Sequence, residues 1–316
     1  MRTIQIPGTE LSVSSICLGT GGLGSSVNRD DSFALLDAYV EQGGNFLDSA
    51  KVYADWLPIE RSASERTIGR WLKSRGNRHQ VIIATKGAHP NLATMHIQRL
   101  SRQEIAADVQ ASLDHLQVDT IDLYWLHRDD PQRPAGEIIE SLNEQLKAGH
   151  IRYFGCSNWQ AGRIQIAQAY SAQHALQGFV ADQMMWSLAA VDAGRMADQT
   201  LVVMDESLKA YHAGSGMAAV PYSSQAGGLF QKLVAGRLQH PAPFYRMDEN
   251  RHRLVRAQQL ASDADLTLTQ VTLGYLLSQP FPCIPIVGCH TLEQLRDSLS
   301  AAEVNLTTSQ VAFLEG

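Results

Sequence analysis

The 316-residue sequence has few cysteines, no excess of basic residues and no long apolar run. Lys and Arg number 26 against 32 Asp and Glu, a net charge of −6. This balance argues against nucleic-acid binding, because neutralising phosphates requires a basic face. No apolar run is long enough to span a bilayer, and the first residues lack the apolar core of a signal peptide. We therefore expect a cytoplasmic protein that acts neither on nucleic acid nor at a membrane.

The cysteines are too few for a disulfide framework in a chain of this length. Three of the four lie in apolar runs typical of strands, which favours buried, reduced thiols. Apolar residues make up 44% of the chain and charged residues 18%, and no segment is of low complexity, so the composition is that of a folded protein. The four cysteines are Cys17, Cys156, Cys283 and Cys289.

Short strand-like runs rich in Val, Ile and Phe alternate regularly with helix-like segments of ten or more residues. Eight such units predict parallel strands with helical crossovers, and we interpret residues 1–316 as a single (β/α)8 barrel domain of the α/β class. The strand-like runs are Ser14–Thr20, Asn45–Ala50, Val81–Gly87, Asp119–His127, Ile151–Asn158, Gly178–Ser187, Met217–Ser224 and Cys283–His290.

A doubly wound dinucleotide-binding sheet is the competing fold. Gly19, Gly21 and Gly24 have the G-x-G-x-x-G spacing of such folds, but the next helical pattern begins only near Asp30. The barrel therefore remains the expected fold.

Two segments go beyond a minimal barrel. Residues 1–13 alternate around a Pro7-Gly8 turn and predict a hairpin, and the long connection 226–250 predicts a lid or binding loop.

Titratable side chains stand at the ends of several predicted strands. Asp48, Lys86 and His127 end the second, third and fourth strands, and Tyr53 follows Asp48 by five residues. Because the carboxyl ends of barrel strands meet at one face, we expect these four side chains to lie together. Polar side chains also end the later strands, namely Ser157, Asn158, Gln183 and Tyr222.

These residue types restrict the chemistry. Asp48 would pair with Lys86 and keep its ammonium charged, and that charge would lower the pKa of Tyr53. His127 could orient a substrate oxygen. The set has no evident nucleophilic Ser or Cys, so it suits proton transfer to a carbonyl oxygen, with a cofactor supplying the electrons.

Six short motifs follow one another along the chain: GGNFLDSAKVY, VIIATKG, YWLH, FGCSN, VPYSS followed by GGL, and PIVGCHTLEQL. In sequence and in order they resemble the motifs of the aldo-keto reductase superfamily, and the resemblance covers nearly the whole chain. The resemblance implies an N-terminal hairpin that closes the bottom of the barrel. It also implies reversible reduction of an aldehyde or ketone by a nicotinamide cofactor. Tyr53 would be the general acid, Lys86 would lower its pKa, Asp48 would hold Lys86, and His127 would position the carbonyl.

The same resemblance assigns the cofactor residues. Tyr222 would stack on the nicotinamide ring. The sequence departs from many relatives at Gly288-Cys289, Gln294 and Ser298, where it leaves only His290 and Arg296 as nearby cations, and NADP(H) is favoured over NAD(H). Lys232 could contact a phosphate, but we interpret it as a solvated loop lysine. The expected cofactor-binding residues are Ser157, Asn158, Gln183, Tyr222, Ser223, Gly227, Leu229, Gly288, Cys289, His290, Gln294 and Ser298.

The loop after Tyr53 is longer than is usual in the family, and we hypothesise that Trp56, Arg128 and Asp129 contact the substrate. A stacking face with hydrogen-bond acceptors would suit a sugar or polyol-related carbonyl. Each residue alone also has a structural explanation; Asp48 and Lys86, for example, could be an ion pair kept for packing.

Three other functions compete with carbonyl reduction. A metal-dependent hydrolase would need a converging ligand set, and no strand ends in His-x-His, so no metal is expected. A Schiff-base lyase would need a deprotonated Lys86, whereas Asp48 would keep it charged. Some relatives of this kind, the potassium-channel β subunits, act mainly as cofactor-binding partners of another protein, which is the alternative to catalysis on a small-molecule substrate.

Overall fold

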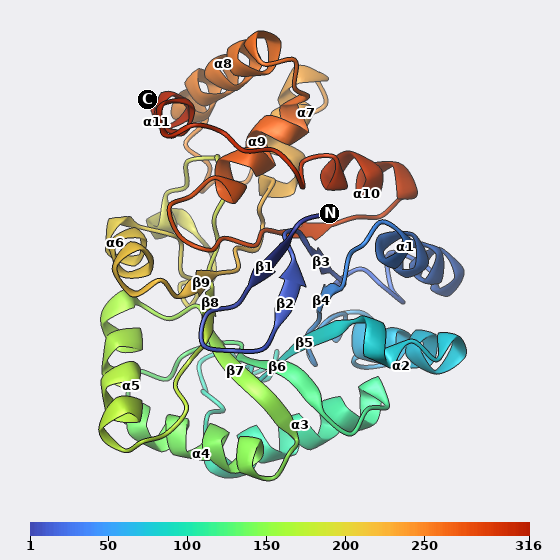
Figure 1. The fold of residues 1–316 in the computed structure, drawn as a ribbon, viewed down its shortest axis with the longest axis vertical. Coiled ribbons are helices and arrows are strands. Elements are labelled where there is room, and N and C mark those ends of the chain that lie inside the picture. The colour runs from blue at the N-terminus through green and yellow to red at the C-terminus, as the bar shows by residue number, and fades with distance from the viewer.

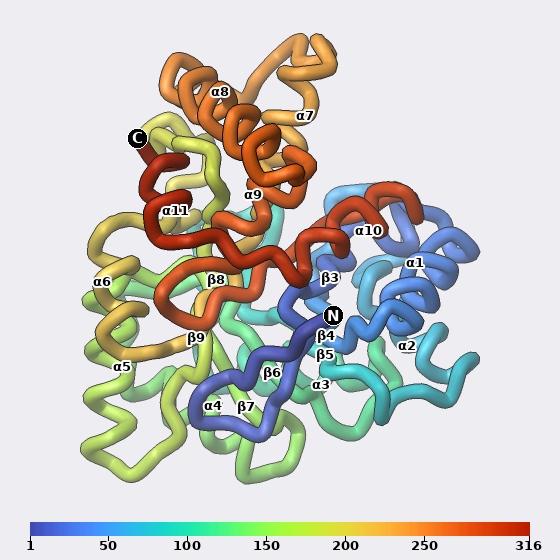
Figure 2. Tube along the Cα trace, turned by 45° about the horizontal axis from the view of Figure 1, so that its top comes forward, coloured from blue at the N-terminus to red at the C-terminus, as the bar shows by residue number.

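The computed structural model describes residues 1–316 as a curled sheet of eight parallel strands with helices around it (Figures 1 and 2). The strand order is β10-β3-β4-β5-β6-β7-β8-β9. A parallel bridge between Ala219 and Cys283 joins β9 to the segment that leads into β10, so the sheet closes. The strands are β3 (Cys17–Gly19), β4 (Phe46–Asp48), β5 (Ile82–Gly87), β6 (Ile121–Leu126), β7 (Ile151–Ser157), β8 (Ala181–Gln183), β9 (Ala218–Ala219) and β10 (Ile286–Gly288). The predicted (β/α)8 barrel is confirmed.

Helices connect successive strands and cover the outside of the barrel. A cluster of buried apolar side chains fills the layer between sheet and helices. The helices are α1 (Arg29–Glu41), α2 (Ala63–Arg75), α3 (Arg102–Leu116), α4 (Ala135–Lys147), α5 (Ala161–Gln173), α6 (Glu206–Ser215), α7 (Leu229–Val234), α8 (Met247–Asp263), α9 (Leu268–Leu277), α10 (Leu292–Leu299) and α11 (Thr308–Glu315).

The helix boundaries follow from local capping. Asn28 accepts a hydrogen bond from the Asp31 amide and starts α1 close to the predicted position. At α3 the side chain of Ser101 accepts from the Glu104 amide and the Glu104 carboxylate accepts from the Ser101 amide, which forms a capping box. No helix is both long enough and apolar enough to cross a membrane.

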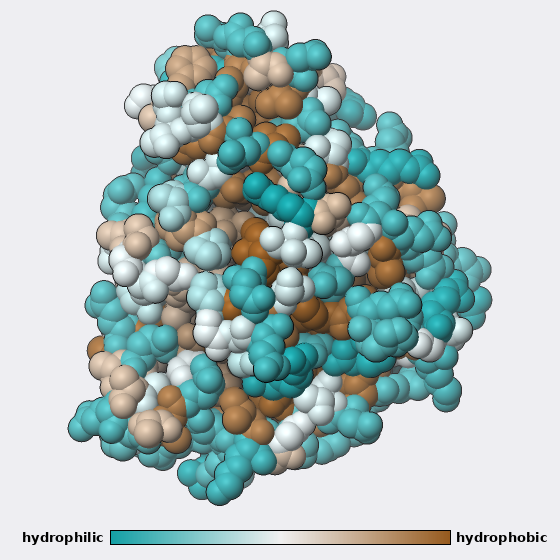
Figure 3. All heavy atoms as spheres, viewed as in Figure 1, coloured by the Kyte–Doolittle hydropathy of each residue, from teal (hydrophilic) through white to brown (hydrophobic).

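The N-terminal hairpin closes one end of the barrel. Strands β1 (Thr3–Gln5) and β2 (Ser12–Ser14) pair antiparallel. Ile6, Leu11 and Val13 are buried in one cluster with Phe46 and Trp125, whose strands line the barrel interior. In Figure 1 the hairpin crosses the middle of the view, and the same face is mainly hydrophilic in Figure 3. This arrangement leaves the opposite end, where the strands finish, for chemistry.

Several predicted segments differ from the structure, and of the run 178–187 only Ala181–Gln183 forms a strand, β8. The strand run 14–20 is divided between β2 and β3, because its first residue belongs to the hairpin. The run 217–224 forms only the two-residue strand β9, since Pro221 has no amide hydrogen and Ser223 has a φ of +54°. The predicted loop 226–250 contains the short helix α7, preceded by the 3₁₀ turn η3 (Ala226–Gly228).

The longest irregular connection lies elsewhere. After β8 the chain runs from residue 184 to residue 205 with only the 3₁₀ turn η2 (Ala193–Arg195) before α6 begins. Met185 forms parallel bridges with both Val203 and Tyr222, so the two ends of this connection lie beside the carboxyl end of the barrel.

Candidate active site

The four expected catalytic side chains meet at the carboxyl end of the barrel. Asp48 ends β4, Lys86 lies near the end of β5, and His127 follows β6 directly. The Lys86 ammonium lies 2.5 Å from Asp48 Oδ2 and 3.1 Å from the Tyr53 hydroxyl, and it donates to the Ser49 carbonyl at 2.8 Å. Lys86 and Asp48 are only 3% and 2% exposed, whereas Tyr53 is half-buried. The arrangement therefore connects a buried ion pair to an accessible phenol.

The electrostatics keep Lys86 charged and Tyr53 protonated. Burial lowers the pKa of Lys86, but Asp48 and Tyr53 raise it by more, so its net pKa lies above the usual value. Burial raises the pKa of Tyr53, and the opposing effect of the Lys86 ammonium does not cancel it. Lys86 thus lowers the pKa of Tyr53 as expected, but desolvation of the phenolate outweighs this effect, and the net pKa of Tyr53 lies above its usual value.

His127 has an aromatic partner that the sequence did not suggest. Its ring lies edge to face with His89, at 4.8 Å between centroids, and edge to face with Tyr53, at 6.0 Å. Burial, followed by the charges of Arg128 and Lys86, holds the pKa of His127 well below its usual value. A neutral imidazole therefore stands beside Tyr53, and its Nδ1 is buried without a hydrogen-bond partner.

Gln183 contacts the ion pair from the other side. Its Nε2 donates to Asp48 Oδ1 at 2.7 Å, so each oxygen of this carboxylate has its own donor. Its Oε1 is buried and has no partner. An unpaired buried carbonyl is costly unless a donor reaches it, and the amide group of a nicotinamide is a donor of the right kind.

Asn158, Ser157 and Tyr222 form a separate network. Asn158 Oδ1 accepts from the Tyr222 hydroxyl at 2.6 Å and from the Val202 amide at 3.0 Å. Its Nδ2 donates to the His127 carbonyl at 3.2 Å and to Ser157 Oγ at 3.1 Å. Asn158 and Ser157 are thus occupied within the protein, and among the three amide-binding candidates Gln183 has the free buried acceptor.

A cleft of about 700 Å³ extends from the ends of β3 and β10 to α7 and α10. Its glycines leave room: a Cβ added at Gly227 or Gly288 would meet no atom within 4 Å, and Gly227 and Gly228 have φ values of +62° and +77°. With the free Gln183 oxygen nearby in the barrel, these residues fit an extended dinucleotide. Of the expected cofactor residues, the cleft is lined by Ser223, Gly227, Gly288, Cys289, His290, Gln294 and Ser298.

The cations of this cleft differ from those expected. Lys232 and Arg237 line it together with His290, whereas Arg296 is exposed on α10 outside the lining. Lys232 is exposed, as expected for a solvated lysine, but it lies on α7 rather than in a loop and also lines the cleft. No sequence pattern indicated Arg237, because its place in the cleft depends on how the chain turns after α7.

Several expected cofactor residues are held by the protein itself. Leu229 is buried and does not line the cleft. Ser298 is 4% exposed and accepts from Gln225 Nε2 at 3.0 Å, and Cys289 packs against it. Gln294 Oε1 accepts from the His290 amide at 2.8 Å and so fixes the first turn of α10. These side chains shape the wall of the cleft more than they offer free donors.

A model of the aldo/keto reductase family matches residues 15–316. The chain belongs to the aldo/keto reductase family. Members of this family are oxidoreductases that act on carbonyl compounds with nicotinamide cofactors. The resemblance seen in the sequence is therefore confirmed.

Similar proteins agree with this assignment. The chain is 30% identical to the uncharacterized oxidoreductase YrpG of Bacillus subtilis, over 94% of this chain and 90% of that protein. It is 30% identical to norsolorinic acid reductase B of Dothistroma septosporum, over 98% of this chain and 79% of that protein. Its fold is similar to the solved structure of the thermostable aldo-keto reductase Tm1743 with the inhibitor epalrestat, with a TM-score of 0.76, 22% identity and coverage of 100% and 99%.

On the substrate side of this aldo/keto reductase, two expected contacts are occupied. Asp129 forms an ion pair with Arg163 of α5 at 3.1 Å, and both groups are largely buried. Arg128 is 6% exposed and donates to Thr200 Oγ1, Asp198 Oδ2 and the His127 carbonyl. Trp56, in contrast, is 59% exposed. Of the three proposed substrate contacts, only Trp56 is free to meet a ligand.

The contacts of Arg128 show what the long connection after β8 does. Asp198 and Thr200 bind Arg128 beside His127, and Val202 binds Asn158. Residues 198–202 thus lie against the ends of β6 and β7 and form a wall of the reductase site. Sequence reasoning missed this wall, because residues 188–205 carry no periodic pattern.

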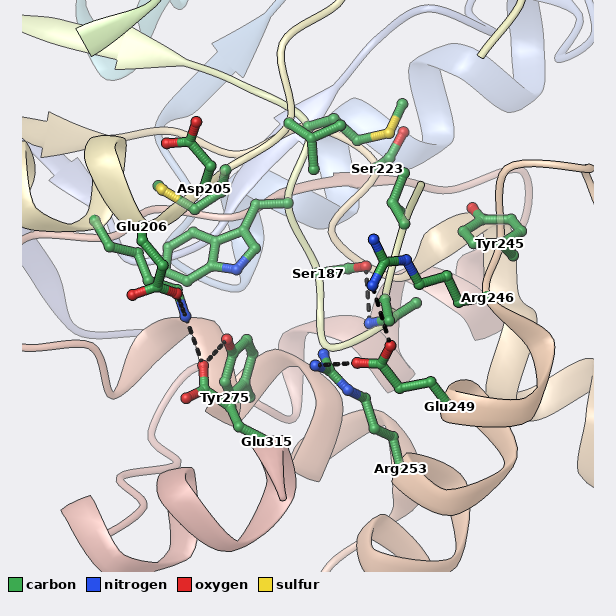
Figure 4. A pocket seen from close by; sticks show the side chains of 18 residues that line it. Ser187, Asp205, Glu206, Ser223, Tyr245, Arg246, Glu249, Arg253, Tyr275 and Glu315 are labelled. Atoms are coloured by element: carbon green, nitrogen blue, oxygen red, sulfur yellow. Dashed lines mark hydrogen bonds and ion pairs between the residues drawn. The ribbon is translucent and has the colours of Figure 1, made fainter. Parts of the chain in front are cut away.

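A second cavity of about 500 Å³ lies behind Ser223, which also lines the cofactor cleft (Figure 4). None of the four catalytic candidates lines it. Its charged groups pair with one another: Arg253 with Glu249 at 2.7 Å, and Lys209 with Glu315 at 2.9 Å. Tyr275 also donates to Glu315 at 2.6 Å. The Lys209 pair joins α6 to α11, whereas the Arg253 pair lies within α8; Arg253 also donates to the Leu188 carbonyl of the long connection at 2.8 Å.

Proposed function

We propose that this aldo/keto reductase reduces an aldehyde or ketone reversibly with a nicotinamide cofactor and that Tyr53 donates the proton. The observation that supports this most strongly is that one buried ammonium, that of Lys86, contacts both Asp48 and the Tyr53 hydroxyl. Such a group can stabilise the phenolate that remains after Tyr53 has given up its proton. When bound, the nicotinamide would supply the hydride.

The protonation states suit reduction. Tyr53 has a raised pKa, so it carries its proton at neutral pH and can donate it to a carbonyl oxygen. His127 is neutral and adjacent, so a ring nitrogen can hold that oxygen without adding charge. Lys86 has a raised pKa, which argues against its acting as the nucleophile of a Schiff-base lyase.

Residues of the cleft would hold the cofactor. Gln183 Oε1 would accept from the amide of the nicotinamide, Tyr222 would stack on its ring, and the glycines at 227 and 228 would let the backbone approach the pyrophosphate. At the far end Lys232, Arg237 and His290 line the cleft, against one carboxylate, Asp297. This positive balance favours NADP(H) over NAD(H), because the 2′-phosphate adds negative charge.

Turnover tests the proposal directly. Purified protein should consume NADPH, followed by its absorbance, when aldehydes or ketones are added, and an alcohol should form. Tyr53→Phe should lower kcat about 100-fold or more, since it removes the proton donor but keeps the ring. No consumption with any carbonyl, or an unchanged rate in Tyr53→Phe, would refute the proposal; tight cofactor binding without turnover would then favour a regulatory binding partner.

The cofactor preference has its own test. Fluorescence titrations should give tighter binding of NADPH than of NADH. Lys232→Ala and Arg237→Ala should each reduce the ratio of the Kd for NADH to the Kd for NADPH. Lys147→Ala, on the exposed end of α4, should leave this ratio unchanged. Equal affinities in the unmodified protein would show that the 2′-phosphate is not recognised and would favour NAD(H).

A further inference from the structure

A buried aspartate, histidine and cysteine meet between the barrel and α6, apart from the four catalytic candidates. Asp182 on β8, His212 on α6 and Cys156 on β7 are each 0% exposed. Asp182 Oδ2 lies 3.5 Å from His212 Nε2, and Cys156 Sγ donates to Asp182 Oδ1 at 3.4 Å. None of the three side chains lines the cofactor cleft. Because a buried carboxylate is destabilising unless it has partners, this cluster requires an explanation.

One proton is needed between Asp182 and His212. His212 Nδ1 lies 2.9 Å from the Met217 carbonyl oxygen, which can only accept, so Nδ1 carries its hydrogen. Asp182 Oδ2 and His212 Nε2 are buried, and neither has another hydrogen-bond partner. Two bare acceptors in contact would repel each other, whereas a shared proton satisfies both atoms. Burial raises the pKa of Asp182, which favours keeping that proton.

His212 connects several segments of the barrel. Leu208 and His212 are the buried residues of α6, one turn apart, so both face the sheet. The imidazole contacts Asp182 on β8 and the carbonyl of Met217, which leads into β9. The ring of Phe281 packs against it, at 5.3 Å between centroids. The contacts therefore join α6 to β8 and to the start of β9, which lie beside it in Figures 1 and 2.

Asp182 directly precedes Gln183, whose Nε2 donates to Asp48 and whose Oε1 is free. Successive side chains of a strand point to opposite faces, so Gln183 points into the barrel while Asp182 points towards α6. Strand β8 has only three residues, and Cys156 and Ser157 of β7 are opposite Asp182 and Gln183. So short a strand has few ladder hydrogen bonds, and an anchor on its outer face fixes where Gln183 points.

Resting on the proposed function, we propose that Asp182 and His212 are positioning residues for carbonyl reduction. They share one proton and hold β8 where the Gln183 amide contacts Asp48 and the nicotinamide at the same time. Neither residue touches the substrate or the cofactor, because both act through Gln183. This role also explains why a strand that is buried on both faces carries two polar side chains in succession.

Asp182→Val removes the anchor and suits a strand. Fluorescence titration should show that the Kd of NADPH rises about threefold to tenfold, because Gln183 is no longer held in place. With the aldehyde that the unmodified protein reduces fastest, kcat should fall about tenfold while KM stays within about twofold, since Tyr53 and His127 lie on other elements. His212→Phe keeps a ring but removes both nitrogens, and it should change Kd and kcat in the same direction.

Asp182→Asn is the conservative variant. Its Nδ2 can donate to His212 Nε2 and its Oδ1 can still accept from Cys156, so Kd and kcat should stay within about twofold of the unmodified protein. Asp122→Val is the control, because Asp122 is 4% exposed on β6 and pairs with Arg78 and Arg152. Chemical denaturation should show a loss of stability in this control, whereas its Kd for NADPH should be unchanged.

The shared proton has a spectroscopic test that does not require active variants. In ¹⁵N NMR of histidine-labelled protein, the signals that disappear in His212→Phe belong to His212. We expect Nδ1 of His212 to carry a hydrogen in the unmodified protein and in Asp182→Asn. An Nδ1 without hydrogen would overturn the shared proton, because the imidazole would then donate to Asp182 alone.

The kinetic outcomes separate this proposal from the proposed function. Equal changes in the Kd of NADPH in Asp182→Val and Asp122→Val, or no change in either, would overturn the positioning role while leaving carbonyl reduction intact. Asp182→Asn that is as impaired as Asp182→Val would also overturn it, because the hydrogen bonds would then not be what matters. Unmodified protein that neither binds NADPH nor reduces any carbonyl compound would refute the proposed function itself.

Discussion

Gln183 and Asp48 are 135 residues apart in the sequence and share a hydrogen bond of 2.7 Å in the interior of the barrel. The bond gives Asp48 Oδ1 a neutral donor, while Oδ2 contacts Lys86. Because the other end of the Gln183 amide is free, one side chain can contact the ion pair and a cofactor at the same time. Binding of the nicotinamide amide would then restrain the group that positions Lys86.

Gln183→Met removes the hydrogen bond to Asp48 and the free acceptor Oε1 but keeps the volume of the side chain. We expect kcat to fall about tenfold or more, because a buried carboxylate oxygen loses its donor. The pH profile of kcat should also move, since Asp48 is then less able to hold Lys86 charged. Gln145→Met is the control, because Gln145 is a buried glutamine on α4 that contacts His150. A pH profile that moves equally in both variants, or in neither, would contradict the role of Gln183.

The barrel and the meeting of its candidate catalytic residues could be predicted from the sequence because both depend on local pattern. Strand and helix periods identify the eight units, and the carboxyl ends of parallel strands must meet, which brings Asp48, Lys86 and His127 together. Tyr53 could be placed nearby only because it follows Asp48 so closely.

Contacts between loops could not be predicted in this way. The partner of Asp129 proved to be Arg163, and the place of Arg237 in the cleft depends on the turn after α7. The sign of the Tyr53 pKa shift was also out of reach, because it depends on how much water burial removes rather than on which charges are adjacent.

Lys86→Met breaks a buried ion pair and leaves Asp48 without its cation. We expect the free energy of unfolding to fall by about 3 kcal/mol or more. Catalysis should fall at least about 100-fold. Chemical denaturation and initial rates measure the two effects. Lys209→Met is the control, because its pair with Glu315 is partly exposed, and its cost should stay below about 1 kcal/mol. Similar losses of stability in the two variants would contradict the burial argument.

His127 makes stability depend on pH. Burial holds its pKa in the folded protein well below 6.5, so above that pH it is neutral in both states. As the pH falls below 6.5, His127 becomes protonated in the unfolded chain but stays neutral in the folded protein. The free energy of unfolding therefore decreases. The contribution at pH 5.0 is at most about 2 kcal/mol. Denaturant titrations at pH 7.5 and 5.0 should show a smaller loss in His127→Phe than in the unmodified protein. An equal loss in the two proteins would contradict the prediction.

Arg128 links the wall at residues 198–202 to His127. The effect of its charge on His127 can be separated from its effect as an anchor of the wall. Its charge is among the causes that lower the pKa of His127, so Arg128→Gln should move the acidic limb of the kcat/KM profile to higher pH. Asp198→Asn weakens the same anchor but keeps the arginine charge. This variant should raise KM severalfold, and the acidic limb of its kcat/KM profile should not move to higher pH. Arg163→Gln, which removes a cation that pairs with Asp129 instead, should leave the limb in place. A limb that moves upward in Asp198→Asn as well would show that loosening the loop, rather than losing the charge, changes His127.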